Sequence, residues 1–461
     1  MSGFVDDIPR RSWASQSREI GSGRRRIGGS MRIAIFSDSL PPRVDGIAVA
    51  VRHLASGLVR SGHQVLLVGP GAKPGRAMRL PPSGFGLDGV QFLSLPSITT
   101  GFDGYPFTVP LRAKMNRALL DFRPNVVSSQ TVGPIGLTGL SLANRIGAAT
   151  LFTWHTDFEV YGQTYRFSPR LIAAGSYCPY VLGRPGVPSP PRPRAAGEPA
   201  RPAAVCKGLI PASLRRASRW MSAVCAPSTD SADQVRRFGL QRPVYLMPAE
   251  VTPEDLGVGS TAAQLALNRV PDAQTIPYLL FVGRLSREKN LGLLLEAFIR
   301  KVPAPTRLVL VGPANDARMR AILQARAAQL PGRIILVDAL PRNELGEIYR
   351  CASAFVTPSL SETQCLVISE AVALAVPVLV VDPHLAEDRP TGAIRVVPAD
   401  PDALGSALTD AVRAGYRGGA RPSMTKPTDS LAVRFVAAAD TVRAMPVGAT
   451  LHWDEGRWIR A

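Results

Sequence analysis

The sequence predicts an α/β protein made of two doubly wound domains, each built on a parallel sheet. Short apolar, β-branched runs alternate with segments of helical spacing through most of the 461 residues. This alternation is typical of parallel sheets covered by helices on both faces. A chain of this length with 46% hydrophobic residues can also form two large cores. Because the alternation occurs twice, we expect two such domains facing a cleft.

The first domain is expected over residues 31–252. Residues 1–30 precede it and are rich in Ser, Gly and Arg without apolar periodicity, so we expect a disordered extension there. The first strand is predicted at Met31–Asp38, and a helix is predicted at Ala48–Arg60. A proline-rich stretch at 183–204 is predicted to be a surface insertion, because proline fits neither a helix interior nor a sheet interior.

The second domain is expected over residues 261–430, after a linker at 253–260. A segment of helical spacing then begins at Leu431. The second domain's strands are predicted at Leu279–Val282, Arg307–Val311, Arg333–Val337, Ala354–Thr357 and Val376–Val381.

Glu362 and Glu370 are the residues most informative about function. An apolar run ends at Thr357, a turn follows at Pro358, and a helical segment comes next, so the first Glu is expected in a loop and the second in a helix. A helix that starts at the carboxyl edge of a parallel sheet can bind phosphate. Carboxylates on both sides of that point suit the hydroxyl groups that flank the diphosphate of a nucleotide sugar. The alternative is a solvated helix carboxylate and a helix-start residue.

A second phosphate-type pattern lies upstream, where a strand, a glycine turn at Gly283 and a helix follow one another. Arg284 and Lys289 would then lie at the carboxyl end of the strand. A guanidinium and an ammonium group there can neutralise a leaving diphosphate. Taken alone, either cation is more often a surface charge.

The run Gly283–Asn290, together with Ser361–Ala371, resembles the family 4 glycosyltransferases, retaining enzymes of the GT-B fold. In the first half of the chain, Pro41–Ile47 is similar to the glycine loop of that family, and Phe152–Phe158 falls in the expected order. The resemblance covers roughly residues 31–381. It implies two Rossmann-like domains facing a cleft, with the C-terminal segment, 431–461, crossing back to the first domain.

The resemblance also implies transfer of a hexosyl group from a UDP- or GDP-hexose to an acceptor hydroxyl, with retention of configuration. Arg284 and Lys289 would bind the leaving diphosphate. Glu370 would accept hydrogen bonds from the ribose. The remaining contacts to sugar hydroxyls and phosphate would come from Glu362 and from the backbone amides around Leu366 and Val367.

In the first domain, Gly46 would let the backbone of its loop approach the diphosphate closely. His155 follows a predicted strand and is expected to contact the donor sugar or the acceptor, although a lone His after a strand is more often structural. Asp45 could act in the site or merely cap a turn. Asp157 could orient His155, act on the acceptor, or cap a helix.

The sequence leaves the acceptor open between a lipid-linked molecule and a small polyol, aminocyclitol or other natural product. The net charge of +19 attracts anions in general. It comes without a zinc finger, an RNA-recognition signature or an aromatic platform, so no nucleic-acid partner is expected. No metal-ligand cluster and no cofactor beyond the sugar donor are expected either.

No stretch of about 20 apolar residues is present, and the start lacks an apolar signal core. We therefore expect a cytoplasmic protein, and peripheral contact with the inner membrane face stays open. An inactive relative that binds sugar nucleotides as a scaffold is the rival interpretation. It draws on departures from the family pattern, such as Gln364-Cys365 in place of Phe-Gly.

Overall fold

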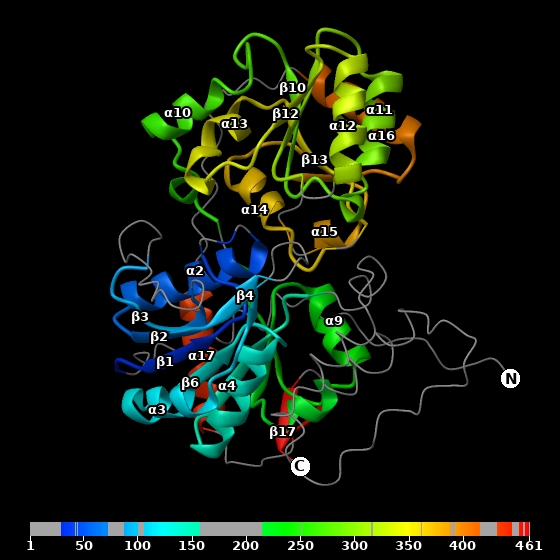
Figure 1. The fold of residues 1–461 in the computed structure, drawn as a ribbon. Helices are drawn as coiled ribbons and strands as arrows, with labels where there is room; N and C mark the ends of the chain where they lie inside the picture. The colour runs from blue at the N-terminus through cyan, green and yellow to red at the C-terminus, as the bar shows by residue number, and fades with distance from the viewer. Residues whose placement is uncertain are drawn as a thin grey trace, which may run out of the picture.

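The computed structural model describes residues 29–71, 87–99, 106–156, 214–249, 251–387, 389, 392–414, 431–444 and 451–460, apart from positions 42, 44, 315, 316, 361, 455 and 456. The insertion predicted at 183–204, nearly all of the extension at 1–30 and Asp157 lie outside these residues. The described residues form two α/β domains, one above the other in Figure 1.

The first domain is built on a parallel sheet whose described strands follow the order β3-β2-β1-β6-β7-β8-β9. The direction of winding reverses between β1 and β6, which makes this the switch point of the sheet. The strands are β1 Arg32–Phe36, β2 Gln64–Pro70, β3 Gln91–Leu95, β6 Val126–Ser129, β7 Ala149–Thr153, β8 Ala223–Ala226 and β9 Val244–Leu246. The helices are α2 Gly46–Arg60, α3 Arg112–Phe122, α4 Pro134–Arg145 and α9 Thr229–Arg237, and β4 Ser97–Thr99 pairs with β5 Pro106–Thr108.

The apolar run of β1 forms a central strand because helices cover both of its faces. Ile33 and Ile35 belong to the core layer that contains α2. Ala34 and Phe36 point to the opposite layer, which contains α3 and α4. This alternation is the period-2 arrangement of a strand buried on both sides, and it explains why the four buried residues after Arg32 are all apolar.

The second domain repeats the design with the strand order β12-β11-β10-β13-β14-β15, all parallel. The predicted pair of doubly wound parallel-sheet domains is therefore confirmed. The strands are β10 Tyr278–Val282, β11 Arg307–Val311, β12 Ile334–Val337, β13 Ala354–Thr357, β14 Val378–Val380 and β15 Ile394–Val396. The helices are α10 Thr261–Leu267, α11 Leu291–Lys301, α12 Ala317–Gln329, α13 Gly346–Cys351, α14 Leu366–Ala373, α15 His384–Glu387 and α16 Pro401–Arg413, with 3-10 turns η1 Pro253–Leu256, η2 Arg287–Lys289 and η3 Arg342–Glu344.

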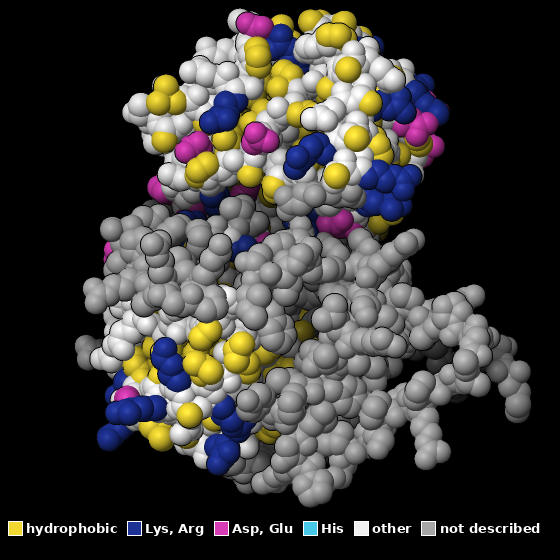
Figure 2. Space-filling model, in the orientation of Figure 1, with side chains coloured by type: hydrophobic (Ala, Val, Ile, Leu, Met, Phe, Trp, Pro, Cys, Tyr) yellow, Lys and Arg dark blue, Asp and Glu magenta, His cyan; other side chains and the backbone are white. Residues whose placement is uncertain are grey.

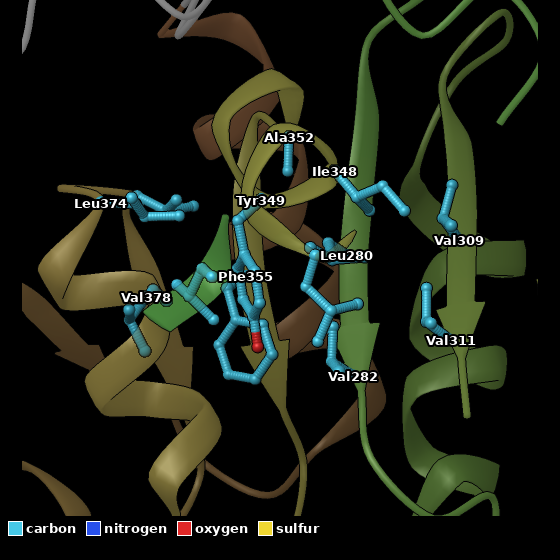
Figure 3. Packing of buried hydrophobic residues seen from close by; sticks show 14 of the residues in the cluster. Leu280, Val282, Val309, Val311, Ile348, Tyr349, Ala352, Phe355, Leu374 and Val378 are labelled. Carbon is cyan, nitrogen blue, oxygen red and sulfur yellow. The ribbon is translucent and has the colours of Figure 1, made fainter. Parts of the chain in front are cut away.

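Tyr349 on α13 is central to the core layer shown in Figure 3, where its ring packs beside Phe355 of β13 and near Leu280 of β10. The centroids of the Tyr349 and Phe355 rings lie 5.8 Å apart. The Tyr349 hydroxyl extends out of this apolar layer to a carboxylate of α14, so the core directly supports one of the predicted functional residues.

The segment predicted as a linker, 253–260, is packed onto the second domain. Thr252 and Asp255 form a capping box that starts η1, and Leu256 is fully buried in the core of that domain. Gly257 adopts a left-handed conformation close to the Asn343 carbonyl, where a side chain would collide. The segment is therefore packed into the second domain, and its Asp255 also lies 3.8 Å from Nε2 of His53 on the first domain.

After the second domain the chain returns to the first, as the helix α17, Leu431–Ala444, packs on α2 and β7. Figure 1 shows α17 behind the sheet of the lower domain. Its buried face includes Ala432, Phe435 and Val436, which lie in the same core layer as β1. The antiparallel pair β16 Leu451–Asp454 and β17 Arg457–Arg460 follows. None of the helices in the described ranges is long and apolar enough to cross a bilayer.

Truncating Phe435 to Ala tests whether α17 is an integral part of the first domain. Phe435 is 1% exposed, so Phe435→Ala is expected to lower the free energy of unfolding by about 3–5 kcal/mol through lost burial and a residual cavity. Urea unfolding measures the change. Arg443→Ala, on the exposed side of the same helix, is the control and should leave stability within about 0.5 kcal/mol. Equal stability of the two variants would contradict this packing.

Candidate functional site

The predicted site residues lie at the switch points of both sheets. In the second domain, β10 and β13 are neighbours, and the loops that leave their carboxyl ends carry the two cations and Glu362. In the first domain, the corresponding ends of β1, β6 and β7 lead to Asp45, Gln130 and His155. In Figure 1, α14 and α15 lie on the side of the upper domain that faces α2 and α9. Both sets of loops therefore meet at the domain interface.

The two predicted phosphate-binding cations each face a carboxylate in this structure. Arg284 lies 3.2 Å from Glu288, and Lys289 forms a direct ion pair with Glu362. The side chains of Lys289 and Glu362 are only 16% and 15% exposed. Burial acts to lower the pKa of Lys289, but the Glu362 carboxylate outweighs it and the pKa is raised. Lys289 is therefore a fixed cation, and a bound diphosphate would compete with Glu362 for it.

The loop before α14 presents backbone amides without a side-chain cap. Cys365 precedes the helix in a left-handed conformation, with φ at 54°, and its side chain makes no capping hydrogen bond. The amides of Leu366 and Val367 therefore begin the helix at its positive end. The guanidinium of Arg389 fixes this loop by donating to the backbone carbonyls of Gln364, at 2.5 Å, and Cys365, at 3.3 Å.

Glu370 is buried in α14 with an exposed fraction of 5%, so the alternative of a solvated helix carboxylate is wrong. The Tyr349 hydroxyl donates to its Oε2 at 2.8 Å. The Nε of Arg342 lies 2.8 Å from its Oε1. Arg342 also extends to the first domain, where its Nη1 lies 2.7 Å from Nε2 of His53 on α2. The carboxylate predicted to bind the ribose is thus connected to the first domain through one arginine.

The loop that carries Glu362 is docked on the first domain by hydrogen bonds. The Thr363 hydroxyl donates to the backbone carbonyl of His155 at 3.1 Å. The Thr363 carbonyl accepts from the Ser228 hydroxyl at 2.5 Å, and the Gln364 amide donates to the Ala249 carbonyl at 2.7 Å. These bonds place the backbone of His155, from the first domain, against Thr363 of the second domain, the residue that follows Glu362.

His155 follows β7 as predicted, and Gln130 holds its ring. Nε2 of His155 lies 2.8 Å from Oε1 of Gln130. Burial lowers the pKa of His155 to about 4, and the nearby Asp45 carboxylate only partly opposes this. The ring is therefore neutral at physiological pH.

Asp45 has a capping role, but it caps the helix α2 and not a turn as the structural alternative had it. Its Oδ1 accepts from the Ala48 amide at 2.9 Å, and its Oδ2 accepts from Ser39 and Arg43. One expectation needs correction, because Gly46 is the first residue of α2 and does not lie in a loop. The capping carboxylate starts the helix two residues earlier than the predicted start at Ala48. Gly46 is exposed, and within the described part of the chain no atom outside its own helix and its chain neighbours lies within 4 Å of where a Cβ would be.

The neutral state of His155 predicts a pH dependence of stability. The unfolded chain binds a proton at this imidazole near pH 6.5, whereas the folded chain binds it only near pH 4. Lowering the pH from 6.5 to about 4 therefore reduces the free energy of unfolding. Above pH 6.5 this contribution of His155 no longer changes with pH. We expect urea unfolding of His155→Gln to show a weaker pH dependence than the wild type over this window. Identical pH slopes for the two proteins would contradict a buried neutral His155.

Three residues that shape the site were not predicted from the sequence: Asp38, Gln130 and Arg342. Asp38 accepts from Thr131 at 2.5 Å and from the amides of Ile135 and Gly136 at 3.0 and 3.2 Å, so it caps the start of α4. An acidic residue directly after the first strand could have signalled this. Gln130 and Arg342 belong to no motif, and their roles depend on tertiary placement.

A metal centre was not expected, and the described ranges bring no three His, Cys, Asp or Glu side chains together in an arrangement able to hold an ion. On the face shown in Figure 2, the Lys and Arg side chains of described residues are dispersed over both domains among hydrophobic and neutral ones. The basic side chains of the described residues on that face therefore form no continuous stripe of the kind that follows a nucleic-acid backbone.

Two family models match the chain, one for each domain. Residues 45–249 match the "Glycosyl transferase 4-like domain", and residues 276–413 match "Glycosyl transferases group 1". One similar protein is the "GDP-mannose-dependent alpha-mannosyltransferase" of Mycobacterium tuberculosis (strain CDC 1551 / Oshkosh), which is 28% identical over 76% of this chain and 79% of its own length. Another is the "Alpha-monoglucosyldiacylglycerol synthase" of Streptococcus pneumoniae (strain ATCC BAA-255 / R6), which is 23% identical over 76% of this chain and 70% of its own.

Solved structures agree on the fold. Anabaena HepE in complex with UDP and glucose superimposes with a TM-score of 0.58 and 13% identity, over 90% of this chain and 95% of that one. Sucrose-phosphate synthase from Thermosynechococcus elongatus gives a TM-score of 0.58 and 17% identity, over 90% and 96%.

Two parallel-sheet domains with loops meeting at their switch points, matched in both halves by glycosyltransferase models, define an enzyme that transfers sugars. The chain belongs to the family 4, or group 1, glycosyltransferases of the GT-B fold.

Proposed function

We propose that this enzyme transfers a hexosyl group from a nucleoside-diphosphate sugar to an acceptor hydroxyl, with retention of configuration. The observation that carries the proposal is the meeting of Lys289, Glu362 and the start of α14 with His155 at the domain interface. A diphosphate on this cation and these amides would place its sugar beside Glu362 and His155.

GDP-hexose is the preferred donor, with UDP-hexose as the alternative. The preference for GDP-hexose is supported by sequence similarity, because the mycobacterial relative is a GDP-mannose-dependent mannosyltransferase. The alternative, UDP-hexose, is supported by HepE, which was solved with UDP and glucose. On the protein side, Glu370 would bind the ribose hydroxyls, which both nucleotides share. This carboxylate therefore favours a ribonucleotide without choosing the base.

The acceptor proposed first is a lipid-linked molecule at the inner face of the membrane, because the pneumococcal relative is a synthase of monoglucosyldiacylglycerol. Such an enzyme would be cytoplasmic and would touch the membrane peripherally. A small polyol, aminocyclitol or other natural-product acceptor is the alternative, and a soluble acceptor would require no membrane contact.

For the chemistry, we propose that Arg284 and Lys289 neutralise the leaving diphosphate and that no metal ion is required for this. An inverting enzyme would need a base that takes the proton of the acceptor. Asp45 is the carboxylate beside His155, and it is engaged by Ser39, Arg43 and the first turn of α2. Asp45 is therefore already bound by protein partners and is a poor candidate for that base, and we propose retention from the resemblance to the family 4 enzymes.

A scaffold that binds sugar nucleotides without transferring sugar is the second candidate. It is favoured by one observation, namely that Glu370, Lys289 and Arg284 all contact protein partners in this structure. Such a protein would bind nucleotide sugars but release no nucleoside diphosphate.

Transfer is tested by incubating the full-length chain with GDP-mannose or UDP-glucose, together with a diacylglycerol in vesicles or a soluble polyol, and following the release of nucleoside diphosphate. The one-bond coupling constant between the anomeric carbon and its proton reports whether the product is the α- or the β-anomer. The proposal predicts acceptor-dependent release and an α-product from an α-donor. A β-product would contradict retention, and donor binding without release would favour the scaffold.

A further inference from the structure

The ring of His155 is held by a side chain that is itself completely buried. Gln130 follows β6 and is 2% exposed. Its amide nitrogen donates to the Ser128 hydroxyl at 2.7 Å and to the Thr153 hydroxyl at 3.0 Å. In this orientation both N–H groups of the amide have a hydroxyl acceptor, which leaves the carbonyl oxygen to face the imidazole. The end that faces it is the carbonyl oxygen, Oε1, 2.8 Å from Nε2 of His155.

A carbonyl oxygen can only accept, so the nitrogen that faces it must carry the proton. We propose that Gln130 is a positioning residue that holds His155 as its neutral Nε2–H tautomer, which leaves Nδ1 as a hydrogen-bond acceptor for a substrate hydroxyl. The inference rests on the proposed function only for the identity of the substrate. It excludes a cationic imidazole that would bind phosphate.

The charged groups around the ring agree with this assignment. The Asp45 carboxylate acts electrostatically on His155. By itself it would raise the pKa of the ring and favour the imidazolium ion. Arg43 and the Ser39 hydroxyl bind Asp45 and occupy its Oδ2. These partners offset the effect of the Asp45 charge on the pKa of His155. The burial of the ring is the larger effect, and it favours the neutral form.

The place of His155 suits a hydroxyl ligand. Its backbone carbonyl is bound by Thr363, the residue directly after Glu362. The diphosphate has its own partners in Lys289 and the start of α14. A neutral acceptor nitrogen beside them complements the hydroxyl donors of a sugar, whereas a phosphate oxygen would need a donor.

The tautomer can be measured without any assay of activity. The full chain, labelled with nitrogen-15 at its five histidines, gives proton–nitrogen correlations that distinguish the protonated ring nitrogen from the bare one. His155 is assigned by its disappearance in His155→Asn. We expect the Nε2–H tautomer at neutral pH and down to about pH 5. The Nδ1–H tautomer, or an imidazolium ion at neutral pH, would overturn the proposal.

Two variants at one position separate positioning from packing. Gln130→Met removes the acceptor, so the single tautomer should be lost and kcat should fall by about tenfold, the effect of one lost hydrogen bond. Gln130→Glu keeps an acceptor but adds a charge, so it should favour the imidazolium ion and give the kcat profile a new loss on the acid side. Activity of Gln130→Glu should recover at alkaline pH. Unchanged tautomers and a flat pH profile in both variants would refute a positioning role.

Gln234→Met is the matched control. Gln234 is also 2% exposed, and it accepts from the buried indole N–H of Trp154 at 3.0 Å. Its loss should leave the His155 correlations in place. If the predicted tautomer is found but no sugar is transferred from any donor, the positioning role stands and the proposed function fails. If sugar is transferred but His155 is found as the Nδ1–H tautomer, the proposed function stands and the positioning role of Gln130 fails.

Discussion

Lys289→Ala is expected to lower sugar transfer by about a hundredfold or more, as for other lost donors to a developing charge. The leaving diphosphate needs a fixed cation, and Lys289 is buried and kept charged by Glu362. The variant also leaves Glu362 without its partner, which adds repulsion toward the diphosphate. Arg284→Ala should have an effect of similar size. Turnover is measured as released nucleoside diphosphate under donor saturation.

Arg287→Ala is the control for both cation variants. Arg287 lies in the same turn, η2, and is exposed to solvent, so its loss changes the net charge by the same amount without touching the ion pair. It should retain near-normal turnover. Thermal unfolding of all three variants checks that the fold survives. Turnover near the wild-type value in both Lys289→Ala and Arg284→Ala would remove these cations from the mechanism.

Glu370→Gln is expected to weaken binding of free GDP or UDP by about 1–3 kcal/mol, the scale of hydrogen bonds to a charged group. An ionised carboxylate offers about four acceptor positions. In the structure Tyr349 and Arg342 each contact one oxygen of Glu370, which leaves positions for two vicinal ribose hydroxyls. An amide oxygen offers only two acceptor positions, so it cannot accept from Tyr349, Arg342 and both ribose hydroxyls at once. Isothermal titration with each free nucleotide measures the loss.

The matched control for this variant is Glu296→Gln. Glu296 pairs with Arg300 on the exposed face of α11, and its side chain is 48% exposed. Its nucleotide affinity should equal that of the wild type. If Glu370→Gln folds and binds both nucleotides with unchanged affinity, Glu370 is only a structural partner of Arg342.

The two sheets could be predicted from the sequence because strands buried on both faces carry unbroken apolar runs. β1 and β10 are the clearest examples. Glycine and proline mark the loops at their carboxyl ends, so Arg284 and Glu362 could be placed at one sheet edge. That edge binds ligands in every doubly wound sheet, which is why local patterns were enough for this part of the site.

The partners of these residues could not be predicted, because they come from elsewhere in the chain. Arg342 meets Glu370 only after α13 and α14 have packed, and its contact with His53 requires both domains. Gln130 likewise reaches His155 through the pairing of β6 with β7. For Thr252 and Asp255 a local signal did exist, since a capping box can be recognised in the sequence. The segment was nevertheless predicted as a linker.

The most direct test of a sugar-nucleotide site around Lys289 is calorimetric titration of the wild type, Lys289→Ala and Arg287→Ala with GDP-mannose and UDP-glucose. We expect the wild type and Arg287→Ala to bind at least one of these donors with equal affinity, and Lys289→Ala to bind it at least about tenfold more weakly. Equal affinity of all three proteins for that donor would contradict this site, and so would the absence of binding to both donors by the wild type.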